Sequence, residues 1–209
     1  MLIHPWDSAT DDESLAVVRR LGFGQLIVPG SDRDLPVVVP TQYVVADGEP
    51  LRVLLHLARP NPVFRALAER PRCLLSVAGD WAYVPSDWKA IGDEDPLVGI
   101  PTTYYAAVQL EADVEVVDDP VRLAEILRTQ LSDVQPGTPV SDPEVVHARQ
   151  LSGIRGLVLT VTAVRGKLKY GGNVDAAHRA AVAERLEQRG GPGDSAARAH
   201  VLRSIDSDA

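Results

Sequence analysis

At residues 52–62 the chain reads RVLLHLARPNP, an apolar run that ends in a polar corner. The run has the length and composition of a buried strand, and Asn61 with Pro62 is a typical N-cap and first helical residue. Free backbone N–H groups at such a helix start favour an anion, and His56 and Arg59 lie at the same corner. We therefore predict a phosphate or carboxylate site here. A plain strand and turn with a solvated arginine is the alternative.

The flanking sequence predicts an antiparallel sheet. A hairpin is expected from strands at residues 23–28 and 35–41, because the polar turn 30–34 separates two runs rich in apolar and β-branched residues. Pro36 and Pro40 cannot donate to a strand ladder, which places the second strand at an edge. Further strands are expected at residues 51–56, 73–78, 81–84, 102–117 and 156–169.

Two turn signals connect these strands. Asp47-Gly48 leads into the strand before the polar corner, and Gly79-Asp80 predicts a hairpin between residues 73–78 and 81–84. The segment 89–101 is the longest loop of this part of the chain. Six or seven antiparallel strands joined in this way predict a mainly β protein, a small barrel with helical decoration.

Helices are expected at the ends and in one late crossover. Predicted helices cover residues 11–21, 61–69 and 119–131, a further one capped by Ser141, and an Ala/Arg-rich segment interrupted at residues 190–193. We predict a barrel domain over residues 1–170, with a helical insertion at about 119–150 before the last long strand. Residues 171–209 are predicted to form a C-terminal helical segment.

Composition and charge narrow the function. A net charge of −8 disfavours direct DNA binding, because the molecule as a whole repels polyanions. No apolar run approaches the roughly 20 residues needed to cross a membrane, and residues 1–7 lack the character of a signal peptide, so a cytoplasmic location is expected. The single cysteine, Cys73, has an apolar setting that predicts a buried, inert thiol.

Common catalytic motifs are missing from the sequence. The glycines form no dinucleotide or Walker pattern, and there is no nucleophile elbow or zinc-protease helix. The five histidines show no metal-ligand spacing, so no metal site is predicted. Because paired carboxylates, a Ser–His arrangement and an activated cysteine are also lacking, no catalytic side chain is assigned.

Four separated motifs resemble, in their order, the PaiB-like branch of the FMN-binding split-barrel proteins. The motifs are HLARPNP (56–62), AYVPSDW (82–88), PTTYYAAV (101–108) and GIRG (153–156) leading to KYGGN (169–173). The resemblance covers most of the chain. It implies an antiparallel split β-barrel that forms a homodimer, with FMN at the subunit interface. Such proteins are usually labelled FMN-binding negative transcriptional regulators.

The resemblance also implies roles for single residues. Arg59 would meet the FMN phosphate with His56 and Asn61 nearby, within a motif that includes Leu57 and Ala58. Pro40 and Thr41 would line the ring pocket, and Trp88 and Tyr105 would supply flat walls. Lys169 and Asn173 would close the pocket, either from the same subunit or from the second one. Trp88 and Tyr105 as core or interface aromatics are the alternative.

The sequence departs from the family at residues 170–172, which read Tyr-Gly-Gly where the family typically has Leu-Ser-Gln. The departure removes side chains that would contact the flavin, and a plain exposed turn is the alternative here.

Three functions stay open. The first is a flavin-binding protein or flavin-dependent oxidoreductase, and a deazaflavin is an alternative cofactor to FMN. The second is a regulator that acts by contact with another macromolecule. The third is a dimeric barrel without cofactor that serves as an interaction module.

Overall fold

A computed structural model of the chain describes residues 1–31, 34–97, 99–139 and 151–206. These residues form a mainly β fold with helices around it, as the sequence predicts. Its strands are β1 (Phe23–Val28), β2 (Val37–Gln42), β3 (Val44–Ala46), β4 (Arg52–Ala58), β5 (Arg72–Val84), β6 (Thr102–Val117) and β7 (Ile154–Lys169).

The described helices are α1 (Asp11–Leu21), α2 (Val63–Glu69), α3 (Pro120–Val134), α6 (Ala176–Arg189) and α7 (Asp194–Asp206), with 3-10 helices η1 (Pro5–Asp7) and η2 (Ser86–Lys89). The chain divides into two compact units. We call residues 15–77 and 109–164 the barrel unit, and residues 1–14, 78–108 and 165 onward the ribbon unit.

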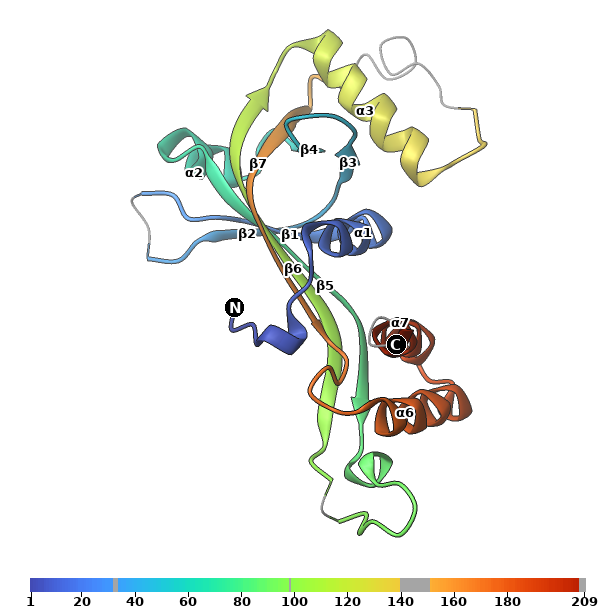
Figure 1. The fold of residues 1–209 in the computed structure, drawn as a ribbon. Coiled ribbons are helices and arrows are strands. Elements are labelled where there is room, and N and C mark those ends of the chain that lie inside the picture. The colour runs from blue at the N-terminus through green and yellow to red at the C-terminus, as the bar shows by residue number, and fades with distance from the viewer. Residues whose placement is uncertain (32–33, 98, 140–150, 207–209) are drawn as a thin grey trace. The chain divides into compact units, whose positions relative to one another are not determined.

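The barrel unit is an antiparallel split β-barrel. The strands follow the order β2-β1-β5-β6-β7-β4-β3, so β2 and β3 are the two edges of one sheet. A single residue, Tyr43, joins these edges, and the sheet must therefore curl on itself, as the ring of strands in Figure 1 shows. Tyr43 is 1% exposed, and its hydroxyl donates to the carbonyl of Val18 in α1 at 2.9 Å.

Alternation along β4 separates the inside of the barrel from the outside. Val53, Leu55 and Leu57 are buried, while Leu54 and His56 on the other face are half-buried. β4 pairs antiparallel with β7, with His56 opposite Gly156. An added Cβ at Gly156 would lie 2.7 Å from Ile126 of α3, so the missing side chain lets α3 approach the sheet.

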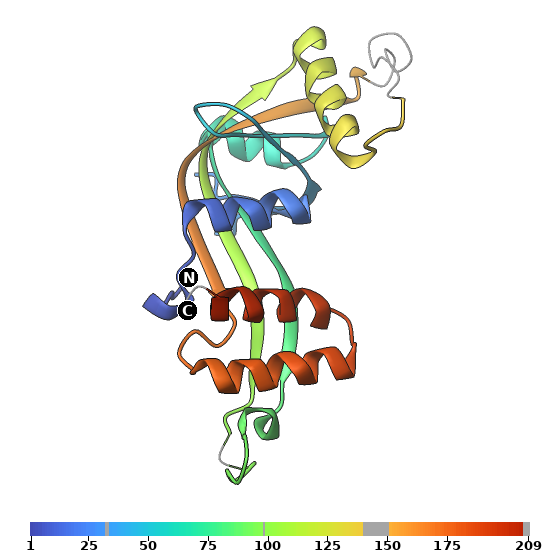
Figure 2. The ribbon, with the colours of Figure 1, turned by 45° about the vertical axis from the view of Figure 1, so that its right-hand side comes forward.

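The ribbon unit contains the second half of β5, the first half of β6 and the end of β7. Helices α6 and α7 lie side by side and are drawn together in Figure 2. On β5, Ala82 and Val84 are buried, whereas Trp81 and Tyr83 on the opposite face are 61% and 50% exposed. α6 begins at the cap Asp175 and ends at Gly190, whose positive φ of 57° matches a glycine C-cap.

The predicted hairpin around Gly79-Asp80 is wrong, because β5 runs through it as one strand of 13 residues. Asp80 has φ 53°, and the buried positions change from odd to even numbers across this point. A Gly-Asp pair can make a hairpin turn or a kink in a continuous strand, and here it makes the kink.

Other boundaries differ less. β1 and β6 have the predicted bounds, and β1 pairs with the edge strand β2 as an antiparallel hairpin. α2 begins at Val63 with Pro62 as its N-cap, two residues later than predicted. Within the insertion, α3 is present with the cap Asp119, while the helix predicted from Ser141 lies outside the described residues.

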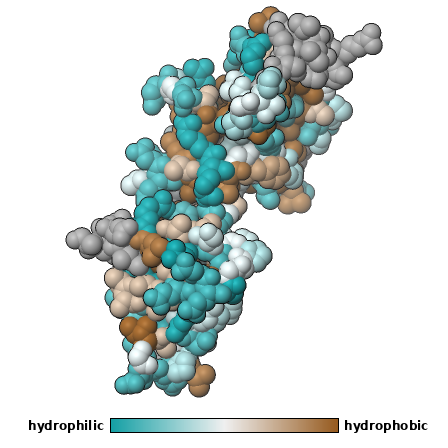
Figure 3. Space-filling model, turned by 90° about the vertical axis from the view of Figure 1, so that its right-hand side faces the viewer, coloured by the Kyte–Doolittle hydropathy of each residue, from teal (hydrophilic) through white to brown (hydrophobic). Residues whose placement is uncertain are grey.

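Hydrophobic side chains on the face drawn in Figure 3 lie in separate patches among hydrophilic ones. Within the described part of the chain, no helix has the length and apolar character needed to cross a membrane.

Candidate functional site

The arginine predicted to bind a phosphate is already held by the protein. Arg59 follows β4, and its side chain donates from Nε to the carbonyl of Ser152 at 2.9 Å and from Nη2 to that of Ile154 at 3.2 Å. Nη1 donates to Oδ1 of Asp118 at 2.9 Å. These bonds connect the end of β4 with the β6–α3 junction and the start of β7.

A second arginine shares the same carboxylate. Arg155 donates from Nε to Oδ1 of Asp118 at 2.9 Å, and from Nη2 to Oδ2. Its guanidinium also lies over the ring of Phe64 in α2, 4.9 Å from the centroid. The hydrogen bonds from Arg155, and then those from Arg59, hold the pKa of Asp118 below its usual range. Two guanidiniums facing one carboxylate leave a net positive charge.

We call Arg59, Asn61, Asp118 and Arg155 the arginine corner. Sequence reasoning did not assign Arg155 or Asp118 to the site, although Arg155 lies in the quoted GIRG motif. Asp118 gave no sequence signal beyond its place before a helix cap. The antiparallel pairing of β4 and β7 places Leu57 opposite Arg155. Arg155 therefore lies beside the end of β4, where Arg59 follows, and only the structure shows that the two arginines meet.

The start of α2 offers fewer free donors than predicted. The side-chain oxygen of Asn61 accepts from the Val63 amide at 3.0 Å, and the Asn61 carbonyl accepts from the Phe64 amide at 3.3 Å. α2 has seven residues, and Pro62 has no amide hydrogen. The positive charge of the corner therefore comes from its arginines, and the helix start contributes little.

His56 is directed away from this corner. Its Nδ1 lies 2.7 Å from Oε1 of Gln130, a buried residue of α3. Leu57 faces the barrel interior and is buried, while Ala58 is exposed. The four side chains of the HLAR motif thus lie in four different surroundings.

The predicted ring-pocket residues Pro40 and Thr41 lie on the edge strand β2. Pro40 is exposed opposite Gln25, and Thr41 is buried opposite Gly24. The Thr41 hydroxyl donates to the carbonyl of Gln42 at 3.0 Å. A Cβ at Gly24 would lie 2.8 Å from the Ser76 carbonyl of β5, so the missing side chain lets β5 lie close to β1 at this point.

In the ribbon unit the structure brings together Tyr105 and Lys169. Nζ of Lys169 lies 5.8 Å from the Tyr105 ring centroid and donates to the Thr102 hydroxyl at 2.7 Å. Lys167, which sequence reasoning missed, lies 5.7 Å from the same ring. Lys167 and Lys169 are two residues apart on β7, so their side chains lie on the same face of the strand. This two-residue period was the sequence signal that could have identified Lys167.

The charge at this ring is partly balanced. Nζ of Lys167 lies 3.6 Å from the carboxylate of Asp7 and donates to the Leu2 carbonyl at 3.1 Å. Burial and then the charge of Lys169 lower the pKa of Lys89. The surroundings of Tyr105 therefore favour an electron-rich group.

Trp88 and Asn173 have separate surroundings. Trp88 in η2 lies under the guanidinium of Arg189, 4.5 Å from the ring centroid. Asn173 is exposed in the turn before α6. The predicted residues thus fall into two groups, with Pro40 to Asn61 in the barrel unit and Trp88 to Asn173 in the ribbon unit.

The unusual Tyr-Gly-Gly sequence has a structural reason. Tyr170 is buried, stacks on His200 at 4.4 Å and donates from its hydroxyl to the Asp80 carbonyl at 2.9 Å. Gly171 has φ 80°, and a Cβ there would lie 2.5 Å from the Tyr104 hydroxyl oxygen. Leu and Ser side chains would lose these contacts or meet these atoms.

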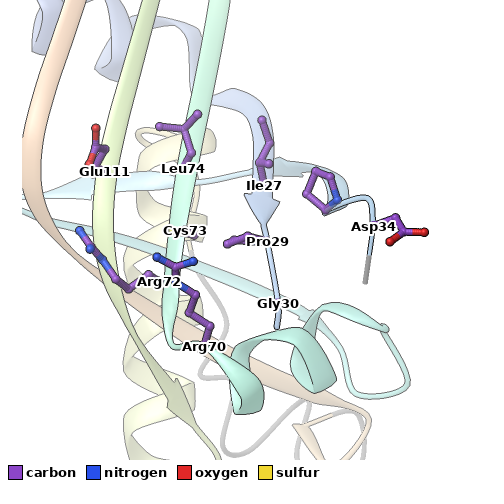
Figure 4. A pocket seen from close by; sticks show the side chains of 10 residues that line it. Ile27, Pro29, Gly30, Asp34, Arg70, Arg72, Cys73, Leu74 and Glu111 are labelled. Atoms are coloured by element: carbon purple, nitrogen blue, oxygen red, sulfur yellow. The ribbon is translucent and has the colours of Figure 1, made fainter. Parts of the chain in front are cut away.

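A pocket of about 470 Å³ in the barrel unit lies apart from all the predicted residues. Figure 4 shows Ile27, Pro29 and Leu74 at this pocket, with the side chains of Arg70 and Arg72 beside β5. Cys73 also lines it but is buried, and burial raises the pKa of its thiol to about 12. Its burial agrees with the prediction, and a raised pKa disfavours the reactive thiolate form.

Solved structures share this fold. The FAD and heme binding protein from Mycobacterium smegmatis has a TM-score of 0.59 and 18% identity, over 79% of this chain and 74% of that one. The flavocytochrome Anf3 from Azotobacter vinelandii has a TM-score of 0.55 and 21% identity, over 79% and 71%. A conserved hypothetical protein from Mycobacterium tuberculosis has a TM-score of 0.57 and 15% identity, over 81% and 91%.

At these identities the likeness shows the fold alone. No curated protein matches the sequence. Residues 1–163 match the family described as "Putative FMN-binding domain". Because the match covers well over half of the 209 residues, the chain belongs to this FMN-binding domain family.

Proposed function

We propose that the protein binds FMN and acts as a flavin-dependent redox protein of the PaiB-like type. The observation that carries the proposal is the arginine corner, where two guanidiniums share one carboxylate in a chain of the FMN-binding domain family. A phosphate is the part of FMN that needs such a cationic, bidentate donor set.

The residues present fit this cofactor by their chemistry. A guanidinium has five N–H donors, and Arg59 uses three of them on the described acceptors Ser152, Asp118 and Ile154. The other two have no hydrogen-bond acceptor among the residues that the structure describes, so we assign them to a ligand. In the ribbon unit, taken by itself, Tyr105 with Lys167 and Lys169 forms a flat surface with positive charge, and this chemistry also suits an electron-rich ring.

In this proposal the chain binds and orients, and the flavin when bound supplies the electron or hydride transfer. Arg59 and Arg155 hold the phosphate end. No side chain is assigned as an obligatory acid, base or nucleophile.

The proposal includes a homodimer. The exposed Trp81 and Tyr83 on β5 support it, since adjacent large aromatic side chains on one strand face are typical of a surface that a partner covers. The sequence resemblance adds a regulatory role to the proposal. The charge of −8 favours regulation through a protein partner or a small molecule over direct DNA binding.

Titration of the purified protein with FMN, riboflavin and a deazaflavin tests the proposal, followed by flavin absorbance or fluorescence. We expect FMN to bind more tightly than riboflavin, because only FMN carries the phosphate. If the protein binds the deazaflavin more tightly than FMN, the proposed cofactor becomes the deazaflavin. Failure of all three ligands to bind would contradict the proposal and favour the cofactor-free interaction module.

A further inference from the structure

Three cationic side chains of α6 hold the segment that follows β5. His178, Arg185 and Arg189 are spaced by seven and four residues, which places them on one face of the helix. Each contacts a different part of residues 86–97. This face is therefore a row of attachment points for η2 and the first part of the long loop.

The two arginines make attachments that do not depend on pH. Arg185 donates to the carbonyls of Asp87 at 2.8 Å and Ala90 at 3.2 Å. Arg189 lies over Trp88 and is itself fixed by Asp194 through two hydrogen bonds of 2.8 and 2.5 Å. A guanidinium stays protonated at all physiological pH values, so η2 stays attached.

His178 makes the third attachment, and it lies between two carboxylates. Its Nδ1 is 2.7 Å from Oδ2 of Asp175, the N-cap of α6. Its Nε2 is 2.9 and 3.1 Å from the two carboxylate oxygens of Glu94 in the loop. Only the imidazolium form can donate to both partners, because a neutral imidazole has a single N–H.

We propose that His178 is a pH-operated latch that fastens residues 91–97 to α6 when its imidazole is protonated and releases them when it is neutral. The latch acts on the loop end alone, since Arg185 and Arg189 keep η2 in place. This role is separate from flavin binding and does not depend on it.

The direction of the pH dependence follows from the carboxylates. Hydrogen bonds donated by the imidazolium to Glu94 and then to Asp175 raise the pKa of His178 above its usual value. The same contacts lower the pKa of both carboxyl groups. The attachment is therefore fully present below the usual histidine pKa of about 6.5, and it is lost as the pH rises through the higher pKa of the folded protein.

Two other charged groups near the loop, Asp95 and Lys89, have interactions of their own. In the loop, the carboxylate of Asp95 accepts from the Leu97 amide at 2.9 Å. In η2, the pKa of Lys89 responds to burial and to Lys169. Among the described residues, the charged groups that act on the pKa of His178 are Glu94 and Asp175, from the loop and the helix cap.

Backbone amides of the loop report the state of the latch. Oε2 of Glu94, the oxygen closest to His178, also accepts from the Ile91 amide at 3.0 Å. The Glu94 amide donates to the Ile91 carbonyl at 3.2 Å. Both amides should lose protection against hydrogen exchange when Glu94 is released.

Hydrogen exchange of the full chain at about pH 5.5 and about pH 8.5, corrected for intrinsic rates, tests the latch. We expect protection of a peptide covering residues 90–97 to fall roughly twofold to fivefold at the higher pH, the range of an exposed ion pair. Peptides containing Trp88 should be unchanged, which also verifies that the protein stays folded.

His178→Gln should show the low protection at both pH values. His4→Gln is the matched control, because His4 lies in the same unit and its described ring contact is with Trp6. Glu94→Gln should behave like His178→Gln. Protection of residues 90–97 that is independent of pH in the wild type, or a pH dependence that persists in His178→Gln, would overturn the proposal.

Discussion

Arg59 and Asp118 form a hydrogen-bonded ion pair of 2.9 Å, so the arginine expected to bind a phosphate already faces a carboxylate. Asp118 is in turn shared with Arg155. A phosphate that enters the corner finds both guanidiniums oriented but must share them with Asp118. The pair therefore sets both the geometry and the strength of anion binding in the proposed site.

Arg59→Ala should weaken FMN by roughly tenfold to a hundredfold, because a charge-assisted hydrogen bond contributes about 1.5–3 kcal/mol. Riboflavin affinity should change little. Fluorescence titration of both ligands separates the contribution of the phosphate to the binding free energy from that of the flavin ring. Arg65→Ala is the control, since Arg65 is an exposed arginine of α2 paired with Glu69. Equal losses for FMN and riboflavin would assign Arg59 to the fold and not to the phosphate.

Asp118→Asn should strengthen FMN relative to riboflavin by about threefold to tenfold, because it removes a negative charge beside the phosphate and keeps an acceptor oxygen. The lowered pKa of Asp118 also predicts a pH effect. The Asp118 carboxylate stabilises the fold above the usual carboxyl pKa, and this stabilisation is lost as the pH falls through the lower pKa that Asp118 has in the folded protein. Urea unfolding of wild type and variant should therefore differ at neutral pH and converge in acid.

His56→Ala should destabilise the fold and leave flavin chemistry intact. The substitution leaves the buried Oε1 of Gln130 without its 2.7 Å partner, which costs about 1–3 kcal/mol in the free energy of unfolding. Chemical denaturation measures the loss. If the variant were to keep its stability and flavin occupancy but lose all turnover, His56 would be catalytic after all.

Gly171→Ala should destabilise the protein by more than about 1 kcal/mol, because it combines a positive φ with a Cβ 2.5 Å from the Tyr104 hydroxyl. Gly137→Ala is a matched control, since Gly137 has φ 77° and no atom within 4 Å of the added Cβ. The difference between the thermal midpoints of the two variants measures the steric contribution to the destabilisation. Adding Tyr104→Phe should recover some of it, and no recovery would mean that the backbone conformation alone sets the cost.

Light scattering should give a mass twice that of the 22.5 kDa chain at micromolar concentration. Replacing both Trp81 and Tyr83 by Ser should shift the equilibrium toward the monomer. Leu35→Ser, at a residue 79% exposed on another part of the chain, should have no such effect. A wild-type protein that stays monomeric would remove the basis for a site shared between subunits.

Much of the fold could be predicted from local patterns. The bounds of β1 and β6 agree with prediction because strict alternation and β-branched runs mark half-buried strands. The cap Asp119 at the start of the predicted insertion accepts a hydrogen bond from the amide of Arg122, as short polar side chains before a helix do. These features depend on residues within a few positions of each other.

Gly79-Asp80 was the point where local reasoning failed. The pair is compatible with a hairpin turn and with a strand kink, and its surroundings decide between them. Asp80 lies 2.9 Å from Nε2 of His200, and its carbonyl accepts from Tyr170, residues 120 and 90 positions away. Such distant contacts favour the kinked, continuous strand, and they leave no periodic signal in the sequence.

The sequence by itself determined most strand positions, the helix cap Asp119, the order of the motifs and the presence of arginines near a strand end. Only the tertiary structure decided which groups meet. The pairing of β4 with β7 brings Arg155 to Arg59, and the end of β6 brings Asp118 between them. The physical reason is that backbone conformation follows from neighbouring residues, whereas the charge balance of a site depends on side chains that folding draws together from distant parts of the chain.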